Sequence, residues 1–263
     1  MSCARRTGAV ASLLAALGVL LVVAIAIGPG AESVRAAASA SSAGAESISD
    51  AWSLVQKALA YAQEIKDARL TVTVSQFDPA TGREVARMRG KLAATVKPPV
   101  LRLEFVEPTA LAGQLVIVDG EKQQVYIYSP VTEQVMVQPI QQAAAMAGVS
   151  LPLTAAGSGD GSIDINKLLQ LPATRDEKNY TVTLVRFEKW MGSEAGVVDI
   201  TSRELPGRQR LWIVRSTGQV GQVESYDQQE RLVVRTIIES LQRNVGLQAT
   251  LLLKLPAGAR VAP

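Results

Sequence analysis

The stretch that decides the fold of this chain is residues 90–140, which read GKLAATVKPPVLRLEFVEPTALAGQLVIVDGEKQQVYIYSPVTEQVMVQPI. Short alternating segments are separated by the turn-forming pairs Pro98-Pro99, Asp119-Gly120 and Ser129-Pro130. Successive side chains of a strand point to opposite faces. In 100–105, Leu101, Leu103 and Phe105 therefore face one side, and Arg102 and Glu104 face the other. The pattern predicts a run of antiparallel hairpins with one apolar and one hydrated face.

The segment before this stretch predicts a helix followed by a hairpin. From Ser49 or Asp50, both good N-caps, to Lys66, an apolar stripe recurs at helical spacing and has Trp52 at its edge. Two alternating strands then flank the turn 78–82, and the first carries Leu70, Val72 and Val74 on one face.

The second half of the chain predicts more strands after an insert. The insert, residues 139–175, holds a helical part at 141–150, a Gly-rich loop at 157–162 and a short helix at 165–171. Strands are then expected over 180–190, 195–204, 210–216, 220–226, 232–241 and 247–255.

The expected fold is mainly β with some α. It is an open, strongly curved antiparallel sheet, that is an unclosed barrel, covered by the N-terminal helix and the helical insert. A sheet with one apolar face has to be covered by helices, stacked on another sheet or closed into a barrel. Residues 47–263 are expected to form this one domain.

The N-terminus has the pattern of an export signal. Arg5-Arg6 precede the apolar run 9–27, and Ala38-Ser39-Ala40 offers a cleavage site. The sequence predicts a signal peptide or an uncleaved membrane anchor in 1–30, because the run approaches the length that spans a bilayer. The Ala/Ser-rich composition of residues 31–46 is typical of a flexible tether. We expect a periplasmic or otherwise extracytoplasmic protein, either released by cleavage or anchored through 9–27.

The composition argues against several functional classes. The chain has no histidine, and its one cysteine, Cys3, precedes the apolar run, so neither the commonest general base nor a thiol is expected in the exported body. Cleavage after Ala40 would remove three basic residues and one acidic residue, which lowers the formal net charge from +3 to +1. We therefore expect no enzyme, no cofactor, no metal and no nucleic-acid partner.

The order of elements resembles the LolA-like periplasmic lipoprotein carriers. The resemblance lies in a Gly-led strand, Lys97-Pro98, an Arg-containing strand ending in Glu107-Pro108, Asp119-Gly120 and a Tyr-x-Tyr-x-Pro run. It implies a half-barrel whose concave apolar face holds acyl chains. The residues expected at this face are Leu70, Val72, Val74, Leu101, Leu103 and Phe105 from strands, with Trp52, Val55 and Leu59 from the helix.

The resemblance also places Lys97 at the cavity mouth, where the family usually has arginine. Lysine keeps the charge without the planar fork of arginine. A solvated surface lysine is the alternative, and the apolar residues fit a packed core as well as a lipid cavity.

The function expected from these observations is an exported hydrophobic carrier. It would bind lipid or lipoprotein acyl chains for transfer between membranes, as a monomer, with a membrane or membrane protein as donor or acceptor. The alternative is an RseB-like extracytoplasmic sensor that binds a partner protein.

Overall fold

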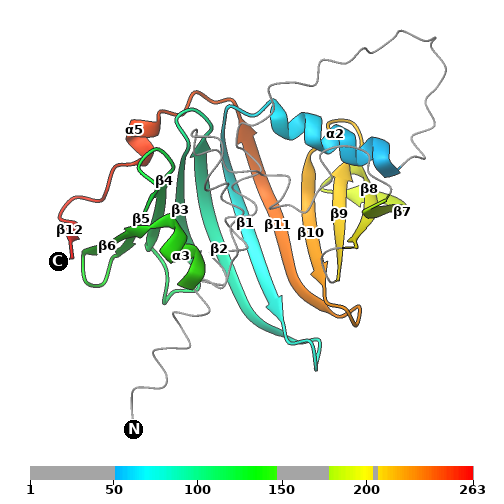
Figure 1. Cartoon of the computed structure of the whole chain (residues 1–263), viewed down its shortest axis with the longest axis horizontal. Coiled ribbons are helices and arrows are strands. Elements are labelled where there is room, and N and C mark those ends of the chain that lie inside the picture. Colours follow the sequence, from blue (N-terminus) through cyan, green and yellow to red (C-terminus); the bar gives the residue numbers. More distant parts are fainter. Residues whose placement is uncertain (1–50, 147–177, 204–206, 263) are drawn as a thin grey trace.

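The computed structural model describes residues 51–146, 178–203 and 207–262. In these ranges twelve strands form one sheet in the order β12-β6-β5-β4-β3-β2-β1-β11-β10-β9-β8-β7 (Figure 1). The first half holds α2 (Ala51–Gln63), β1 (Asp67–Phe77), β2 (Glu84–Thr95), β3 (Val100–Glu107), β4 (Leu115–Asp119), β5 (Gln124–Ser129), β6 (Gln134–Pro139) and α3 (Ile140–Met146). The second half holds β7 (Tyr180–Trp190), β8 (Ser193–Ser202), β9 (Arg208–Val214), β10 (Val220–Tyr226), β11 (Leu232–Arg243), α5 (Ala249–Leu252) and β12 (Arg260–Val261).

The hairpins expected over residues 90–140 are present. Strands β2 to β6 pair in chain order and antiparallel, which is the pairing that short turns allow. The two halves of the sheet meet where β1 pairs with β11, so that Leu70 lies opposite Leu241. This long-range pair makes one sheet out of two meanders.

One face of the sheet, here called the apolar face, is lined by apolar side chains in both halves. Directly opposed residues of neighbouring antiparallel strands point to the same face. In the first half this face carries the row Leu70, Leu92, Leu103, Val116 and Ile127. In the second half it carries Val223, Leu211, Val198 and Leu184.

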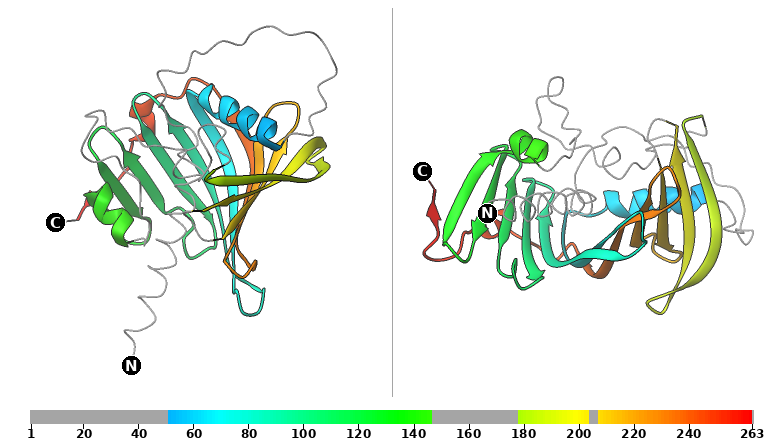
Figure 2. Two further views of the ribbon diagram at one scale, coloured as in Figure 1. Left: turned by 45° about the vertical axis from the view of Figure 1, so that its right-hand side comes forward. Right: turned by 90° about the horizontal axis from the view of Figure 1, so that it is seen from below.

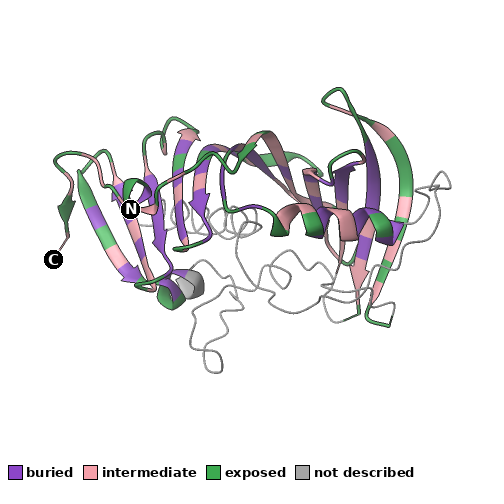
Figure 3. Cartoon of the chain, turned by 90° about the horizontal axis from the view of Figure 1, so that it is seen from above, coloured by how far each residue is buried: buried purple, intermediate pink, exposed green. Residues whose placement is uncertain are grey.

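Two of the described helices cover parts of the apolar face. Helix α2 packs against β7, β8 and β9 (Figure 1), and its buried residues Leu54 and Val55 join a cluster with Val198 and Ile213. Helix α3 packs against β5 and β6 at the other end. Figure 3 shows the buried residues concentrated on the strands and on one side of α2.

The C-terminal residues cover the opposite face, here called the polar face, over β2 to β6. Leu252 packs with Val100 and Ile117, and Leu255 and Tyr126 pack against the same cluster. The strand expected over 247–255 is wrong, because residues 249–252 are helix α5. A short apolar run such as Leu251-Leu252-Leu253 does not distinguish a strand from a helix by periodicity, and here it lies across β2 and β3 instead of pairing with them.

The sheet is open, as expected, since its edge strands β12 and β7 lie at opposite ends (Figure 2). It is not strongly curled, so the expected strong curvature is not found. The C-terminal residues give a physical reason. They bury the apolar side chains on the polar face of β3 to β6, so this burial does not require the sheet to curl. Most of the insert 139–175, the tether and the residues 1–30 lie outside the described residues.

Candidate functional site

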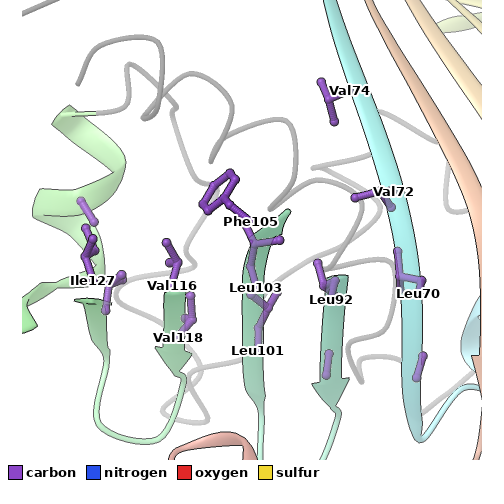
Figure 4. Packing of buried hydrophobic residues seen from close by; sticks show 14 of the residues in the cluster. Leu70, Val72, Val74, Leu92, Leu101, Leu103, Phe105, Val116, Val118 and Ile127 are labelled. Carbon is purple, nitrogen blue, oxygen red and sulfur yellow. The ribbon is translucent and has the colours of Figure 1, made fainter. Parts of the chain in front are cut away.

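The six strand residues expected to line a lipid site all lie on the apolar face and belong to one cluster. Figure 4 shows side chains from β1 to β5 standing on the same side of the sheet. They are nearly inaccessible: Val72 and Val74 have 0% of their surface exposed, and Leu103 and Phe105 have 1%. This cluster, here called the β1–β5 cluster, is the candidate site.

The helical residues expected at the same site lie elsewhere on the apolar face. Val55 and Leu59 pack with Val198 and Ile200 in the cluster between α2 and the strands β8 and β9. Trp52 is also buried on α2. The structure therefore does not bring Val55 and Leu59 into the β1–β5 cluster, to which the last turn of α2 and the residues after it contribute Tyr61 and Ile65 instead.

Between the two helical covers the apolar face has a central stretch over β1 to β4. The helices that pack on this face do so mainly at its ends, α2 on β7 to β9 and α3 on β5 and β6. In the described part of the chain, no helix packs along the central stretch to the same extent. The most apolar part of the face thus lies between two covers.

Gly90 sets how closely β2 and β3 approach on this face. A Cβ added at Gly90 would lie 2.8 Å from Leu103 Cδ1 and 3.2 Å from the carbonyl oxygen of Glu104. The missing side chain leaves the space that Leu103 occupies.

Lys97 lies in the turn between β2 and β3 and is exposed to solvent. This turn is at the end of the sheet where β1 begins, because the backbone N–H of Val96 donates to the carbonyl of Lys66. Lys97 is therefore placed at one end of the candidate site, away from its buried centre.

Sequence reasoning missed one polar residue at the edge of the site. Gln138 on β6 lies opposite Val125, a member of the β1–β5 cluster, so its side chain points to the apolar face. It is 6% exposed, and its Nε2 atom has no hydrogen-bond partner. The alternation of 134–138 could have signalled the orientation, but not the missing partner.

The polar face over β8 to β11 carries a connected set of charged groups. Asp199 accepts hydrogen bonds from Arg208 and Arg210, and Glu224 accepts from Arg235 Nε at 2.7 Å. Burial, and secondarily the hydrogen bond to Glu224, raises the pKa of Tyr226. These groups satisfy one another, which indicates a structural role.

A hollow lies where β8 and β10 end and β9 and β11 begin. Its volume is about 440 Å³, and its lining includes Ile200, Arg208, Tyr226, Asp227 and Val233. Arg208 already pairs with Asp199 and Glu230. The hollow is separate from the β1–β5 cluster, since the two share no lining residue.

Within 51–146, 178–203 and 207–262, no three acidic or cysteine side chains gather as ligands for a metal ion. None of the helices in those ranges is long and apolar enough to span a bilayer.

No protein-family model matches the sequence, and no curated protein matches it. Solved structures do match. An uncharacterized conserved protein from Thermus thermophilus is 12% identical, with a TM-score of 0.50 over 81% of this chain and 98% of that one. A Pseudomonas aeruginosa MucA/MucB complex gives 16% identity and a TM-score of 0.45, over 81% of this chain and 63% of that one. A LolA superfamily protein from Nitrosomonas europaea gives 15% identity and a TM-score of 0.35, over 78% and 97%. At 12% identity, the match to the Thermus thermophilus protein concerns the fold alone.

Proposed function

We propose that this protein is an exported, non-catalytic carrier that binds the acyl chains of lipids or lipoproteins on the apolar face of its sheet. The observation that supports the proposal most directly is the central stretch of the β1–β5 cluster, which lies between the covers provided by α2 and α3. The side chains of this cluster are nearly inaccessible, so acyl chains would have to enter among them, and the burial of their methylenes there would stabilise the complex.

The energetics of acyl binding fit such a surface. Each buried methylene contributes about 0.8 kcal/mol, so a long chain needs few polar contacts to bind firmly. Binding would require no chemistry at the protein, in keeping with the absence of histidine and of a cysteine in the described residues. In this proposal Lys97 lies at the entrance of the acyl-binding site. The protein acts as a monomer outside the cytoplasm, and a membrane or membrane protein donates and accepts the lipid or lipoprotein.

Mass spectrometry of organic extracts from the purified protein tests the proposal first. We expect stoichiometric acylated lipid in the extract, and saturable binding of a fluorescent fatty-acyl probe that raises the melting temperature. A folded protein that extracts clean, gains no stability from acyl ligands and instead captures a partner protein would contradict the carrier and favour the sensor.

The variant Leu103→Glu tests the location of the site. If the space beside Leu103 opens to admit acyl chains, the carboxylate can reach water through the same opening, so we expect a folded variant whose acyl affinity falls at least tenfold. Glu104→Gln, the next residue on the opposite face, is the matched control and should behave like wild type in melting and titration. A Leu103→Glu variant that unfolds would identify Leu103 as packed core, because a buried unpaired carboxylate costs several kcal/mol.

A further inference from the structure

Gln138 is a buried amide in apolar surroundings. It lies opposite Val125 on the apolar face, one strand from Ile127, and the helix that follows contributes Ile140 and Ala143 to the same cluster. Only 6% of its surface is exposed.

The side-chain Nε2 group of Gln138 donates to no atom of the protein. Nearly all buried donors in native proteins are paired, and an unpaired one is unfavourable. A leucine would fill the same place without that penalty. The amide therefore needs a partner that is present in the working state of the protein.

We propose that Gln138 donates a hydrogen bond to the carbonyl oxygen of the ester or amide that links an acyl chain to its headgroup. The inference rests on the proposed carrier function and deepens it, because it sets the class of ligand: acyl esters and amides are preferred over ethers and hydrocarbons.

The geometry of the sheet supports this assignment. From β5 next to Gln138, the row Ile127, Val116, Leu103, Leu92 and Leu70 crosses five neighbouring strands on the apolar face. Neighbouring strands are about 4.8 Å apart, so the row is roughly 19 Å long. An acyl chain held at its carbonyl by Gln138 would extend along this row, with its headgroup at the β6 edge of the sheet.

A matched pair of ligands isolates the carbonyl. We would titrate the purified full-length protein with palmitoyl-lysophosphatidylcholine and with its hexadecyl ether analogue, which have the same headgroup and chain length. A neutral hydrogen bond predicts that wild type binds the ester about three- to tenfold more tightly than the ether. Gln138→Leu should bind both ligands equally and should melt at the same or a higher temperature without ligand.

Gln134→Leu is the control, since Gln134 lies on the same strand and face but is exposed. It should keep the preference for the ester. Equal binding of ester and ether by wild type, a preference that survives in Gln138→Leu, or a lower melting temperature of unloaded Gln138→Leu would overturn the inference while leaving the carrier intact. Failure of wild type to bind either ligand would overturn the carrier function and this inference together.

Discussion

At the scale of the residue, Arg102 shows how a strand position that faces away from the apolar side is used. Its Nη1 atom donates to the carbonyl oxygens of Leu252 at 3.1 Å and Lys254 at 2.5 Å. Partial burial lowers the pKa of Arg102, although an arginine stays protonated at every pH the protein meets. The hydrogen bonds of this one side chain thus attach the C-terminal residues to β3.

Replacing Arg102 by methionine should remove these two hydrogen bonds and so weaken the attachment of the C-terminal residues. Hydrogen bonds from a charged donor contribute more than neutral ones, so we expect a loss of about 1–2 kcal/mol in the free energy of unfolding. Hydrogen exchange should quicken in 249–255. Arg83→Met, at an exposed position in the β1–β2 turn, is the control. Equal midpoints of urea unfolding for the two variants would show that the hydrogen bonds of Arg102 do not stabilise the protein.

Glu239 on β11 forms a second polar contact, with one side chain of β1 and one of β2. It accepts from Thr73 Oγ1 at 2.6 Å and from Arg89 Nη2 at 2.7 Å. The Thr73 hydrogen bond, followed by that of Arg89, lowers the pKa of Glu239 below its ordinary value.

The sign of the resulting pH dependence follows from this direction. A carboxylate with a lowered pKa in the folded state stabilises fully above the unfolded pKa, about 4.3 for glutamate, and loses that stabilisation as pH falls through the folded pKa. We expect wild type to exceed Glu239→Gln in stability at pH 7, and the difference to shrink below about pH 4.3. Glu84→Gln, at an exposed site, should show no such narrowing in urea melts recorded across this range.

At the scale of the element, α2 is held to the sheet by close packing. A Cβ on Gly196 of β8 would overlap with Leu54 Cδ1 of the helix, so this glycine lets the helix approach the sheet. In addition, Lys57 Nζ of the helix donates to the carbonyl of Arg215 at 2.7 Å. The contact between α2 and the sheet therefore combines apolar packing with one hydrogen bond.

Leu54→Ala should therefore remove a central contact of α2. Leu54 is 1% exposed, and truncation of a buried leucine costs about 2–5 kcal/mol. Ser53→Ala, at the exposed neighbouring position, should be close to neutral. A loss below about 1 kcal/mol for Leu54→Ala in chemical denaturation would show that the helix contributes little to the sheet.

At the scale of the whole molecule, the two edges of the sheet differ. The β6 edge is paired with the two-residue strand β12. At the other edge, β7 runs for 11 residues and pairs with β8 alone among the described strands. Its exposed Val185 and Phe187 are accompanied by an irregularity between Leu184 and Arg186 and by charged neighbours. Bulges and charges are known ways to keep an edge from pairing with another chain.

In the proposed monomer, we expect the charges of β7 to prevent this edge from pairing with another chain. The double variant Arg186→Val/Lys189→Val should show association that rises with protein concentration in light scattering, because it leaves an apolar edge. The matched control Arg83→Val/Arg87→Val changes exposed charges near the β1–β2 turn and should stay monomeric. Identical scattering of the two double variants would remove this role for the edge charges.

What the sequence determined by itself is local. Alternation in 90–140 specified the hairpins and the sides on which Leu103 and Arg102 lie, and helical spacing specified α2, because both patterns depend on neighbours only a few residues apart. Tertiary structure alone decided that β1 pairs with β11, that 249–255 cross the polar face as helix and extended chain, and that Val55 packs apart from Leu103. It also decided that Gln138 is buried without a partner for its Nε2 group. These outcomes depend on which distant surfaces meet, and an alternating pattern records only that a face is apolar, not what covers it.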